Sequence, residues 1–125
     1  MAGALTGTVQ RMFDALDKAD TEAALATISA EAEGIDEISR RWIRGGEMTA
    51  YVREMMANVS DVHSEIHDAH ETQWGDTGVV TCWLEQDYTM GGEPGHVSAP
   101  TTVVLRREDG EWKLALFHST PLPEA

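Results

Sequence analysis

The sequence predicts an α+β fold in which a cone-shaped, curved antiparallel sheet of four long strands and one short strand wraps around three N-terminal helices. Within residues 8–58, apolar side chains recur mainly at spacings of three and four, which is typical of amphipathic helices. From Ser60 onward the pattern changes to alternation, which is typical of strands, and short glycine-containing segments separate the runs. Strands joined by successive hairpins run antiparallel, so the C-terminal half should form a meander.

The first helix is predicted over residues 8–19, where one apolar stripe is formed by Val9, Met12, Phe13 and Leu16. A second helix follows in "DKADTEAALATIS", with Asp20 or Thr21 as its N-cap. The short strand is expected at residues 33–39. A third helix, with an apolar stripe rich in Met, is expected from about Gly46 to Asn58.

The first long strand is predicted over residues 60–74, with Val62, Ser64 and Ile66 on one face and His63, His67 and Glu71 on the other. The second is "VVTCWLEQDYTM", followed by a loop, "GGEPGH". The third is "VSAPTTVVLRRE" and the fourth "EWKLALFHST", which are joined by the two-residue turn "DG".

The closing hairpin indicates where His118 should lie. With Asp109 and Gly110 as the turn, counting outward pairs Leu105 with Leu114, Val103 with Leu116 and Thr101 with His118. His118 should therefore share the buried face of the leucines. The opposite face keeps Val104, Ala115 and Phe117, which predicts a cover from a second copy of the chain: a homodimer formed sheet against sheet.

Size and charge restrict the function. A chain of 125 residues is one domain, spanning residues 1–125. Nine Lys and Arg against 22 Asp and Glu give a net charge of −13, which argues against nucleic acid or an anionic membrane as a partner. The sequence shows neither a signal peptide nor a membrane-spanning run, so a cytoplasmic location is expected. Cys82, the one cysteine, should be a buried thiol.

Three stretches carry a resemblance to a known family. "TTVVLRREDGEWKLALFHSTP", the preceding "EQDYTMGGEP" and "DEISRRWIRGGEMTAYVREMM" are similar to the SnoaL-like and nuclear transport factor 2-like superfamily, near the branch that includes the association domain of calcium/calmodulin-dependent protein kinase II. The resemblance implies a curved sheet with a pocket at its open end, usually in a dimer or larger ring. Members include ketosteroid isomerase, polyketide cyclases, dehydratases and purely oligomerising modules.

Two functions follow as expectations. The first is a small-molecule enzyme, an isomerase, cyclase or hydratase that acts on an apolar substrate. The resemblance places its base at Asp36, and Tyr88 or His118 would donate a hydrogen bond to the developing oxyanion. The isomerase's tyrosine and second aspartate have no matching positions. The second function is a non-catalytic module that binds a ligand or assembles. In that case Asp36 is a solvated turn residue and His118 a satisfied core residue.

The expected pocket takes a small apolar molecule and is lined by Trp42, Tyr51, Met55, Leu84, Tyr88, Val103 and Leu116; ordinary core packing is the alternative, above all for Met55 and Leu116. Placing Leu84 and Tyr88 inside follows from the resemblance. No cofactor is expected, and no metal. His63 and His67 stand ~13 Å apart along a strand and cannot share an ion.

Overall fold

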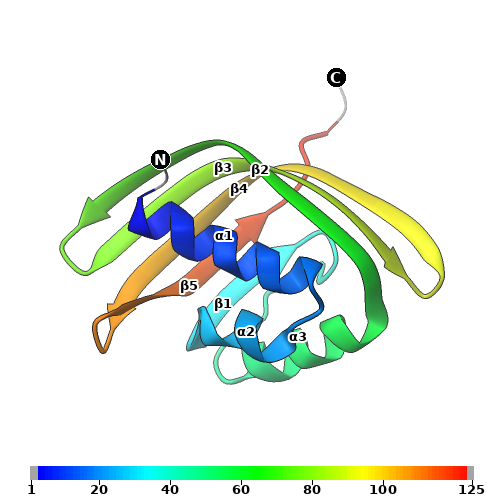
Figure 1. Ribbon diagram of the computed structural model, residues 1–125, viewed down its shortest axis with the longest axis horizontal. Helices are drawn as coiled ribbons and strands as arrows, with labels where there is room; N and C mark the ends of the chain where they lie inside the picture. Colours follow the sequence, from blue (N-terminus) through cyan, green and yellow to red (C-terminus); the bar gives the residue numbers. More distant parts are fainter. Residues whose placement is uncertain (1–2, 124–125) are drawn as a thin grey trace.

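The computed structural model describes residues 3–123 and confirms the predicted α+β fold (Figure 1). Two helices, α1 (Ala4–Asp17) and α2 (Thr21–Ala26), precede strand β1 (Ile28–Asp36) and helix α3 (Glu47–Asn58). Four strands complete the chain: β2 (Val59–Trp74), β3 (Thr77–Met90), β4 (Glu93–Glu108) and β5 (Glu111–Ser119). No helix within the described residues is long and apolar enough to cross a bilayer.

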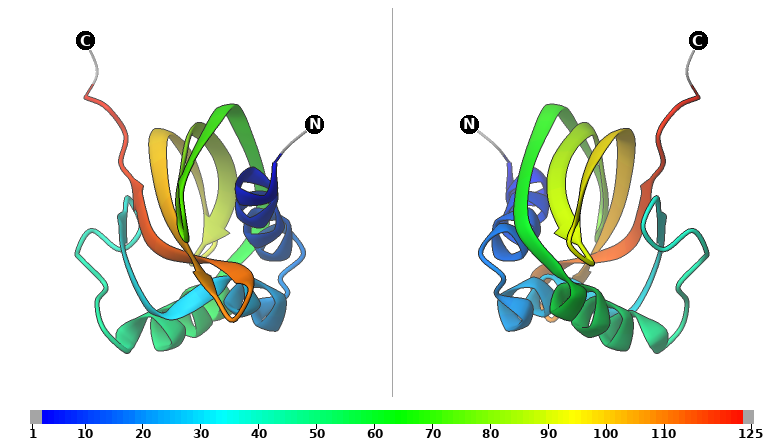
Figure 2. Two further views of the ribbon diagram at one scale, coloured as in Figure 1. Left: turned by 90° about the vertical axis from the view of Figure 1, so that its left-hand side faces the viewer. Right: turned by 90° about the vertical axis from the view of Figure 1, so that its right-hand side faces the viewer.

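The five strands form one curled sheet in the order β1-β5-β4-β3-β2. Strands β2 to β5 form the predicted antiparallel meander, whereas β1 joins the edge parallel to β5. The three helices of the described chain lie on the concave side, as the two side views in Figure 2 show. The first strand was predicted at residues 33–39. It begins earlier, at Ile28, and ends at Asp36, because residues 37–39 form a turn.

The core lies between α1 and the concave face of the sheet. Val9, Met12 and Phe13 of the α1 stripe are buried and Leu16 is partly buried. The core cluster includes Leu5, Val9, Phe13, Val80, Val103 and Leu105. Asp20 caps α2 as predicted, its carboxylate accepting a hydrogen bond from the Ala23 amide at 3.1 Å. The start of α1 is capped from β2, because the Glu71 carboxylate accepts hydrogen bonds from the amides of Leu5 and Thr6 at 3.1 and 3.3 Å.

Two of the turns are two-residue turns with left-handed backbone. Asp109 and Gly110 have φ values of 52° and 81°, as the predicted "DG" hairpin requires. The predicted loop "GGEPGH" is wrong. Only Gly91 and Gly92, with φ values of 60° and 82°, form the turn, and the remaining residues extend β4 opposite β3.

A bulge corrects the predicted register of the closing hairpin. Leu105 pairs with Leu114 as predicted, but Ala115 is then passed over and Val104 pairs with Leu116. The predicted pairs of Val103 with Leu116 and of Thr101 with His118 are therefore wrong. His118 faces Thr102 and is exposed. The prediction that Phe117 stays on the outer face is also wrong, because Phe117 pairs with Val103 and packs inside, its ring centre 6.2 Å from that of Phe13. Thr101 instead meets Ser119, with their hydroxyl oxygens 2.8 Å apart.

Candidate functional site

A cavity of about 110 Å³ opens between the concave face of the sheet, α1, α3 and the end of β1. Its wall is mostly apolar, and polar side chains enter it at a few points. If each water occupies ~10–15 Å³ on this measure, the cavity holds on the order of ten water-sized volumes. It therefore suits a small ligand that exposes mainly carbon and carries a few polar atoms.

Asp36 enters the cavity from the last position of β1. Its Oδ1 accepts hydrogen bonds from the amides of Ile38 at 3.0 Å and Ser39 at 2.7 Å, which form a turn around the carboxylate. Burial raises the pKa of Asp36, and the hydrogen bonds from Ser39 and Ile38 only partly offset that rise. A carboxylate whose pKa is shifted toward neutrality, in a fixed orientation, suits general-base chemistry.

Tyr51 enters the same cavity from α3. Among the side chains of residues 3–123, its hydroxyl is the one buried polar atom without a hydrogen-bond partner. Burial raises the pKa of Tyr51, the nearby negative charge of Asp36 raises it further, and the Ser39 hydroxyl beside it partly offsets this rise. The neighbouring Ser39 hydroxyl forms its own hydrogen bonds with the Asp36 amide at 3.1 Å and the Arg41 carbonyl at 3.0 Å. Tyr51 is thus a neutral donor whose polar neighbour, the Ser39 hydroxyl, already has partners of its own.

Tyr88 contributes a second phenol from β3. Its ring lies over Gly95, its partner on β4, where an added Cβ would stand 2.5 Å from the Tyr88 Cζ. Burial raises the pKa of Tyr88, and the negative charges of Glu37 and Asp36 raise it further. Gly95 therefore leaves the space that allows this ring to lie against the sheet.

Six of the predicted site residues border the cavity, namely Asp36, Tyr51, Met55, Leu84, Tyr88 and Leu116, although the bulge pairs Leu116 with Val104, on the face of the sheet that carries His118. The other three lie elsewhere. Trp42 is 37% exposed in the loop before α3, with its ring centre 5.9 Å from that of His118. Val103 is fully buried beneath α1, and His118 was predicted to face inward but faces outward because of the bulge at Ala115.

Sequence reasoning missed five polar residues of the lining: Glu33, Glu37, Ser39, Gln86 and Ser119. Gln86 does carry a signal. The inward positions of β3 are Val80, Cys82, Leu84, Gln86 and Tyr88, so an amide stands between two apolar or aromatic side chains. Ser39 carries no comparable signal, because its place beside Asp36 depends on the turn after β1.

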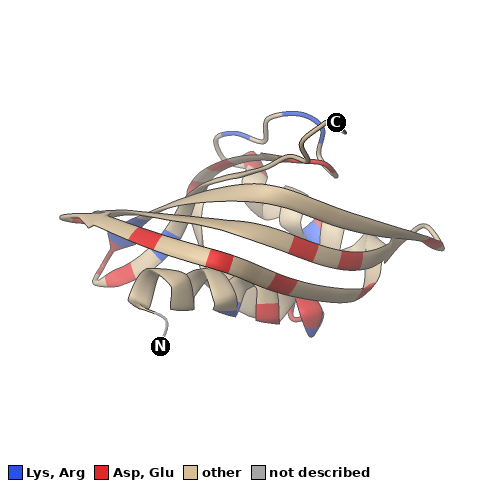
Figure 3. Ribbon diagram, turned by 90° about the horizontal axis from the view of Figure 1, so that it is seen from above, with Lys and Arg blue, Asp and Glu red and all other residues tan. Residues whose placement is uncertain are grey.

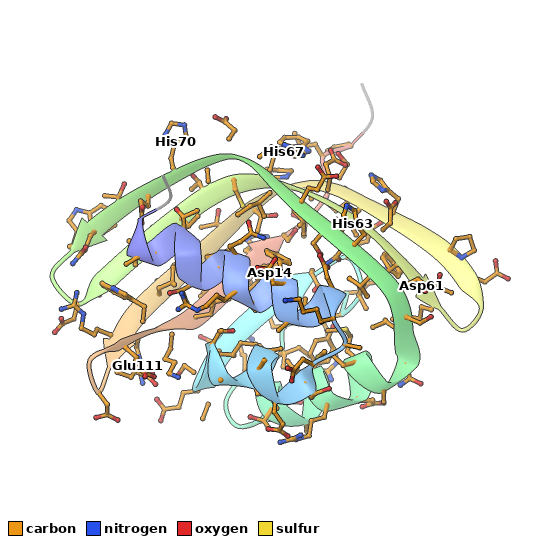
Figure 4. All side chains as sticks on the ribbon, in the orientation of Figure 1. Asp14, Asp61, His63, His67, His70 and Glu111 are labelled. Carbon is orange, nitrogen blue, oxygen red and sulfur yellow. The ribbon has the colours of Figure 1, made fainter. Side chains whose placement is uncertain are left out.

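The remaining candidates lie outside this cavity. Burial raises the pKa of the Cys82 thiol to about 11, which makes it unreactive near neutral pH. His67 and His70 point away from α1 on the convex side of β2 (Figure 4). His67 lies beside Glu65, with 3.8 Å between His67 Nε2 and Glu65 Oε1. No three His, Cys, Asp or Glu side chains within residues 3–123 are arranged to hold a metal ion.

Comparisons with known proteins agree with this geometry. A family model described as a SnoaL-like domain matches residues 6–123. A proposed dehydratase of the nuclear transport factor 2-like family from Streptomyces avermitilis is 19% identical, with a TM-score of 0.85, and the match covers 97% of this chain and 95% of that chain. The calcium/calmodulin-dependent protein kinase II hub of S. rosetta is 20% identical, with a TM-score of 0.78 and coverage of 95% and 97%.

A ketosteroid isomerase-like protein from Erwinia carotovora atroseptica is 18% identical, with a TM-score of 0.76, and the match covers 97% of this chain and 95% of that chain. At these identities the likeness shows the fold alone. No protein with a curated functional description matches the sequence. The family resemblance predicted from the sequence is confirmed, and the chemistry has to be argued from the cavity itself.

Proposed function

Because the chain belongs to the SnoaL-like domain family, we propose that its cavity binds a small, largely apolar carbonyl compound and that Asp36 removes a proton from the carbon next to the carbonyl. Tyr51, with Tyr88 beside it, donates a hydrogen bond to the oxygen on which negative charge develops. The reaction class is an isomerisation, a cyclisation or a dehydration that begins with this proton transfer. Such a step needs a base and an oxyanion donor in one apolar site.

The buried Tyr51 hydroxyl is the observation that carries the proposal. A buried donor without a partner costs about 1–3 kcal/mol, and nearly all such groups in native proteins are paired. The hydroxyl is closed to solvent in the ligand-free protein, so a ligand carbonyl that displaces a neighbouring side chain and takes its place against this hydroxyl would supply the missing acceptor. Asp36 lies close enough to influence the pKa of Tyr51, so the same carbonyl would bring its neighbouring carbon near the base.

Exchange of carbon-bound protons tests the proposal directly. Acetophenone in D₂O exchanges its methyl protons when a base removes them, and NMR follows the loss of the methyl signal. We expect the protein to accelerate exchange and Asp36→Asn to lower that acceleration by about 10²–10⁴-fold, the usual contribution of a general base. The asparagine oxygen still accepts from Ile38 and Ser39, so the turn is retained.

Asp87→Asn is the matched control, because Asp87 is an exposed carboxylate on the other side of the sheet. It should leave exchange unchanged. Acceleration that survives Asp36→Asn would contradict the assignment of the base. Binding of acetophenone without any acceleration would leave a ligand-binding module and no enzyme.

We also propose that the convex face of the sheet joins two copies of the chain. The helices of the described chain leave this face open (Figure 2), and Trp83 stands on it with 37% of its surface exposed. The Trp83 indole N–H already donates to Glu85 at 3.1 Å and Ser98 at 3.0 Å, so its ring is held in place for apolar contact. A second copy is the partner that this chain always supplies.

Charge on the convex face predicts how such a dimer responds to pH. Strands β2 and β3 contain acidic residues but no Lys or Arg, as Figure 3 shows. His96 lies between two carboxylates there, 2.7 Å from Asp87 and 2.8 Å from Glu85. These hydrogen bonds, from Asp87 first and then Glu85, raise the pKa of His96. Protonation of His96 as the pH falls reduces the repulsion between two such faces.

Sedimentation velocity tests the dimer. We expect self-association that strengthens as pH falls toward the ordinary histidine pKa of ~6.5 and that is lost in Trp83→Glu. Trp74→Glu is the control, since Trp74 is 63% exposed but lies at the tip of the β2–β3 hairpin. A monomer at every pH, or a dimer that tolerates Trp83→Glu, would contradict this interface.

A further inference from the structure

A chain of hydrogen bonds runs from the end of α1 to the wall of the cavity. Asp17, the last residue of α1, accepts from the Ser64 amide at 3.0 Å and from the Ser64 hydroxyl at 2.8 Å. The Ser64 hydroxyl in turn accepts from the Gln86 side-chain amide at 3.0 Å. Ser64 and Gln86 are 7% and 8% exposed, so this chain is shielded from bulk water. It joins three elements, α1, β2 and β3, at one point of the cavity wall.

The carboxylate at the start of this chain fixes the direction of every proton in it. An ionised carboxylate only accepts hydrogen bonds, so the single proton of the Ser64 hydroxyl goes to Asp17. The hydroxyl can then only accept from Gln86, which requires the NH₂ group of the Gln86 side chain to face Ser64. The Gln86 carbonyl oxygen, Oε1, is therefore fixed on the other arm of the amide.

Nothing in the described chain uses that oxygen. Within residues 3–123 no group donates a hydrogen bond to Gln86 Oε1, and this atom is not among the sealed, unpaired ones. Gln86 lines the cavity, and this oxygen is the polar atom that its side chain can offer to a ligand there. A buried acceptor of fixed orientation in an apolar wall is the kind of group that selects a ligand donor, because a ligand without one leaves it unpaired.

We propose that Gln86 Oε1 is a specificity-determining acceptor and that the natural ligand carries a hydroxyl or N–H group in addition to its carbonyl. This inference rests on the proposed function, and it narrows the ligand to a small hydroxylated or amide-bearing carbonyl compound. Asp36 and Tyr51 bind the carbonyl end from β1 and α3, and Gln86 binds the donor end from β3. A neutral donor suits the neutral amide, since an ammonium group would lose more solvation on entering an apolar cavity.

The chain of hydrogen bonds from Asp17 to Gln86 also explains why an aspartate stands at the C-terminal end of α1, where the helix dipole disfavours a negative charge. A negative charge at the C-terminal end of a helix interacts unfavourably with the helix dipole. The two hydrogen bonds from Ser64 compensate for this placement, and they orient the Gln86 amide through Ser64. An apolar residue at position 86 would continue the inward-facing apolar side chains of β3 and would need neither Ser64 nor Asp17 as a hydrogen-bond partner.

Isothermal titration with matched ketones tests the inference. The probes are acetophenone, its para-hydroxy derivative and its para-methoxy derivative, together with the meta-hydroxy isomer to allow for the position of the donor. We expect one hydroxy isomer to bind the wild-type protein about 5–30-fold more tightly than acetophenone, the gain from about 1–2 kcal/mol of hydrogen bonding. The methoxy derivative, which cannot donate, should show no such gain.

Two variants assign the preference to Gln86. Gln86→Leu should abolish the preference for the hydroxy ketone and leave acetophenone binding within about twofold, because Leu keeps the apolar wall. Ser64→Ala removes the anchor of the amide and keeps the amide itself, so the preference should weaken without disappearing. A wild-type protein that binds acetophenone and its hydroxy derivatives equally, or a preference that survives Gln86→Leu, would overturn the inference and leave the proposed function intact.

Binding of none of these ketones would instead remove the proposed function, and this inference with it. Should Gln86→Leu fail to fold, NMR of the wild-type protein gives the same answer. The Gln86 side-chain NH₂ signals should shift on addition of the hydroxy ketone and much less with acetophenone. Equal shifts with both compounds would overturn the inference.

Discussion

Replacing Tyr51 by Phe should stabilise the ligand-free protein, which is an unusual outcome for a substitution in a well-packed region. Phe keeps the ring and removes only the hydroxyl, whose buried oxygen has no partner in the described chain. A buried donor without a partner lowers the free energy of unfolding by about 1–3 kcal/mol, and the substitution removes this loss. For a domain of this size 1 kcal/mol corresponds to roughly 3–5 °C in Tm, so the midpoint should rise by about 3–15 °C.

Urea denaturation followed by tryptophan fluorescence measures the free energy of unfolding of both proteins with a shared m-value. Tyr88→Phe is the matched control, since its hydroxyl is not sealed from solvent and its removal should change stability by less than about 0.5 kcal/mol. Tyr51→Phe should at the same time weaken acetophenone binding. A loss of 1 kcal/mol or more in Tyr51→Phe would show that the hydroxyl is paired in solution and would refute the reasoning.

Three further predictions follow from the same structure. Because burial raises the folded-state pKa of Asp36 above 3.8, ionisation of this carboxyl opposes folding. The unfolding free energy of Asp36→Asn relative to the wild type should therefore not differ below pH 3.8, should increase as the pH rises, and should reach a plateau above the folded-state pKa. Urea titrations that give the same difference at every pH would contradict this. Glu71→Ala should lower the unfolding free energy by about 1 kcal/mol through loss of the α1 cap, with exposed Glu93→Ala as a near-neutral control in the same denaturation assay. Gly95→Ala should lower the free energy of unfolding by about 1–3 kcal/mol and weaken ketone binding, because the new Cβ displaces the Tyr88 ring. If the variant changes neither the unfolding free energy nor ketone binding, the ring moves freely.

The helices and hairpin turns could be predicted because their signals are local. Asp20 and the Asp109–Gly110 turn act within a few residues of themselves, and both predictions are confirmed. The bulge at Ala115 could not be predicted, because a small side chain is acceptable on either face of a sheet and nothing else in the strand marks the extra residue. That single bulge moved His118 from the predicted inner face to the outside.

A similar irregularity changed β2. The predicted alternation placed Glu71 on the same face as His63 and His67, whereas the register shifts between His67 and His70, where Asp68 has a φ of 54°. After this bulge Glu71 turns inward and caps α1. Strand parity is thus reliable only between bulges, and both segments in which the predicted face is wrong follow one.

The candidate site divides in the same way. The family resemblance placed Asp36, and the structure brings it to the cavity, but the importance of Tyr51 could not be read from its position in an apolar helical stripe, where a tyrosine fits ordinary core packing. Its lack of a partner depends on the turn at Ser39, which directs the nearest hydroxyl to the Arg41 carbonyl. Hydrogen-bond satisfaction depends on tertiary structure, and no pattern along the chain predicts it.

A module that only assembles and a ligand-binding enzyme make different demands on the cavity, and stability measured together with ligand binding can separate them. A module that only assembles gains nothing from a buried unpaired hydroxyl or from a carboxylate whose burial opposes its ionisation, because both features lower the free energy of unfolding. Such a module should therefore be stabilised by Tyr51→Phe and Asp36→Asn and still form the same dimer. A ligand-binding enzyme should gain the same stability and lose ketone binding or proton exchange. Stability gained together with these losses would identify the cavity as the functional site, because the cost of the two polar groups is then offset only when a ligand is bound.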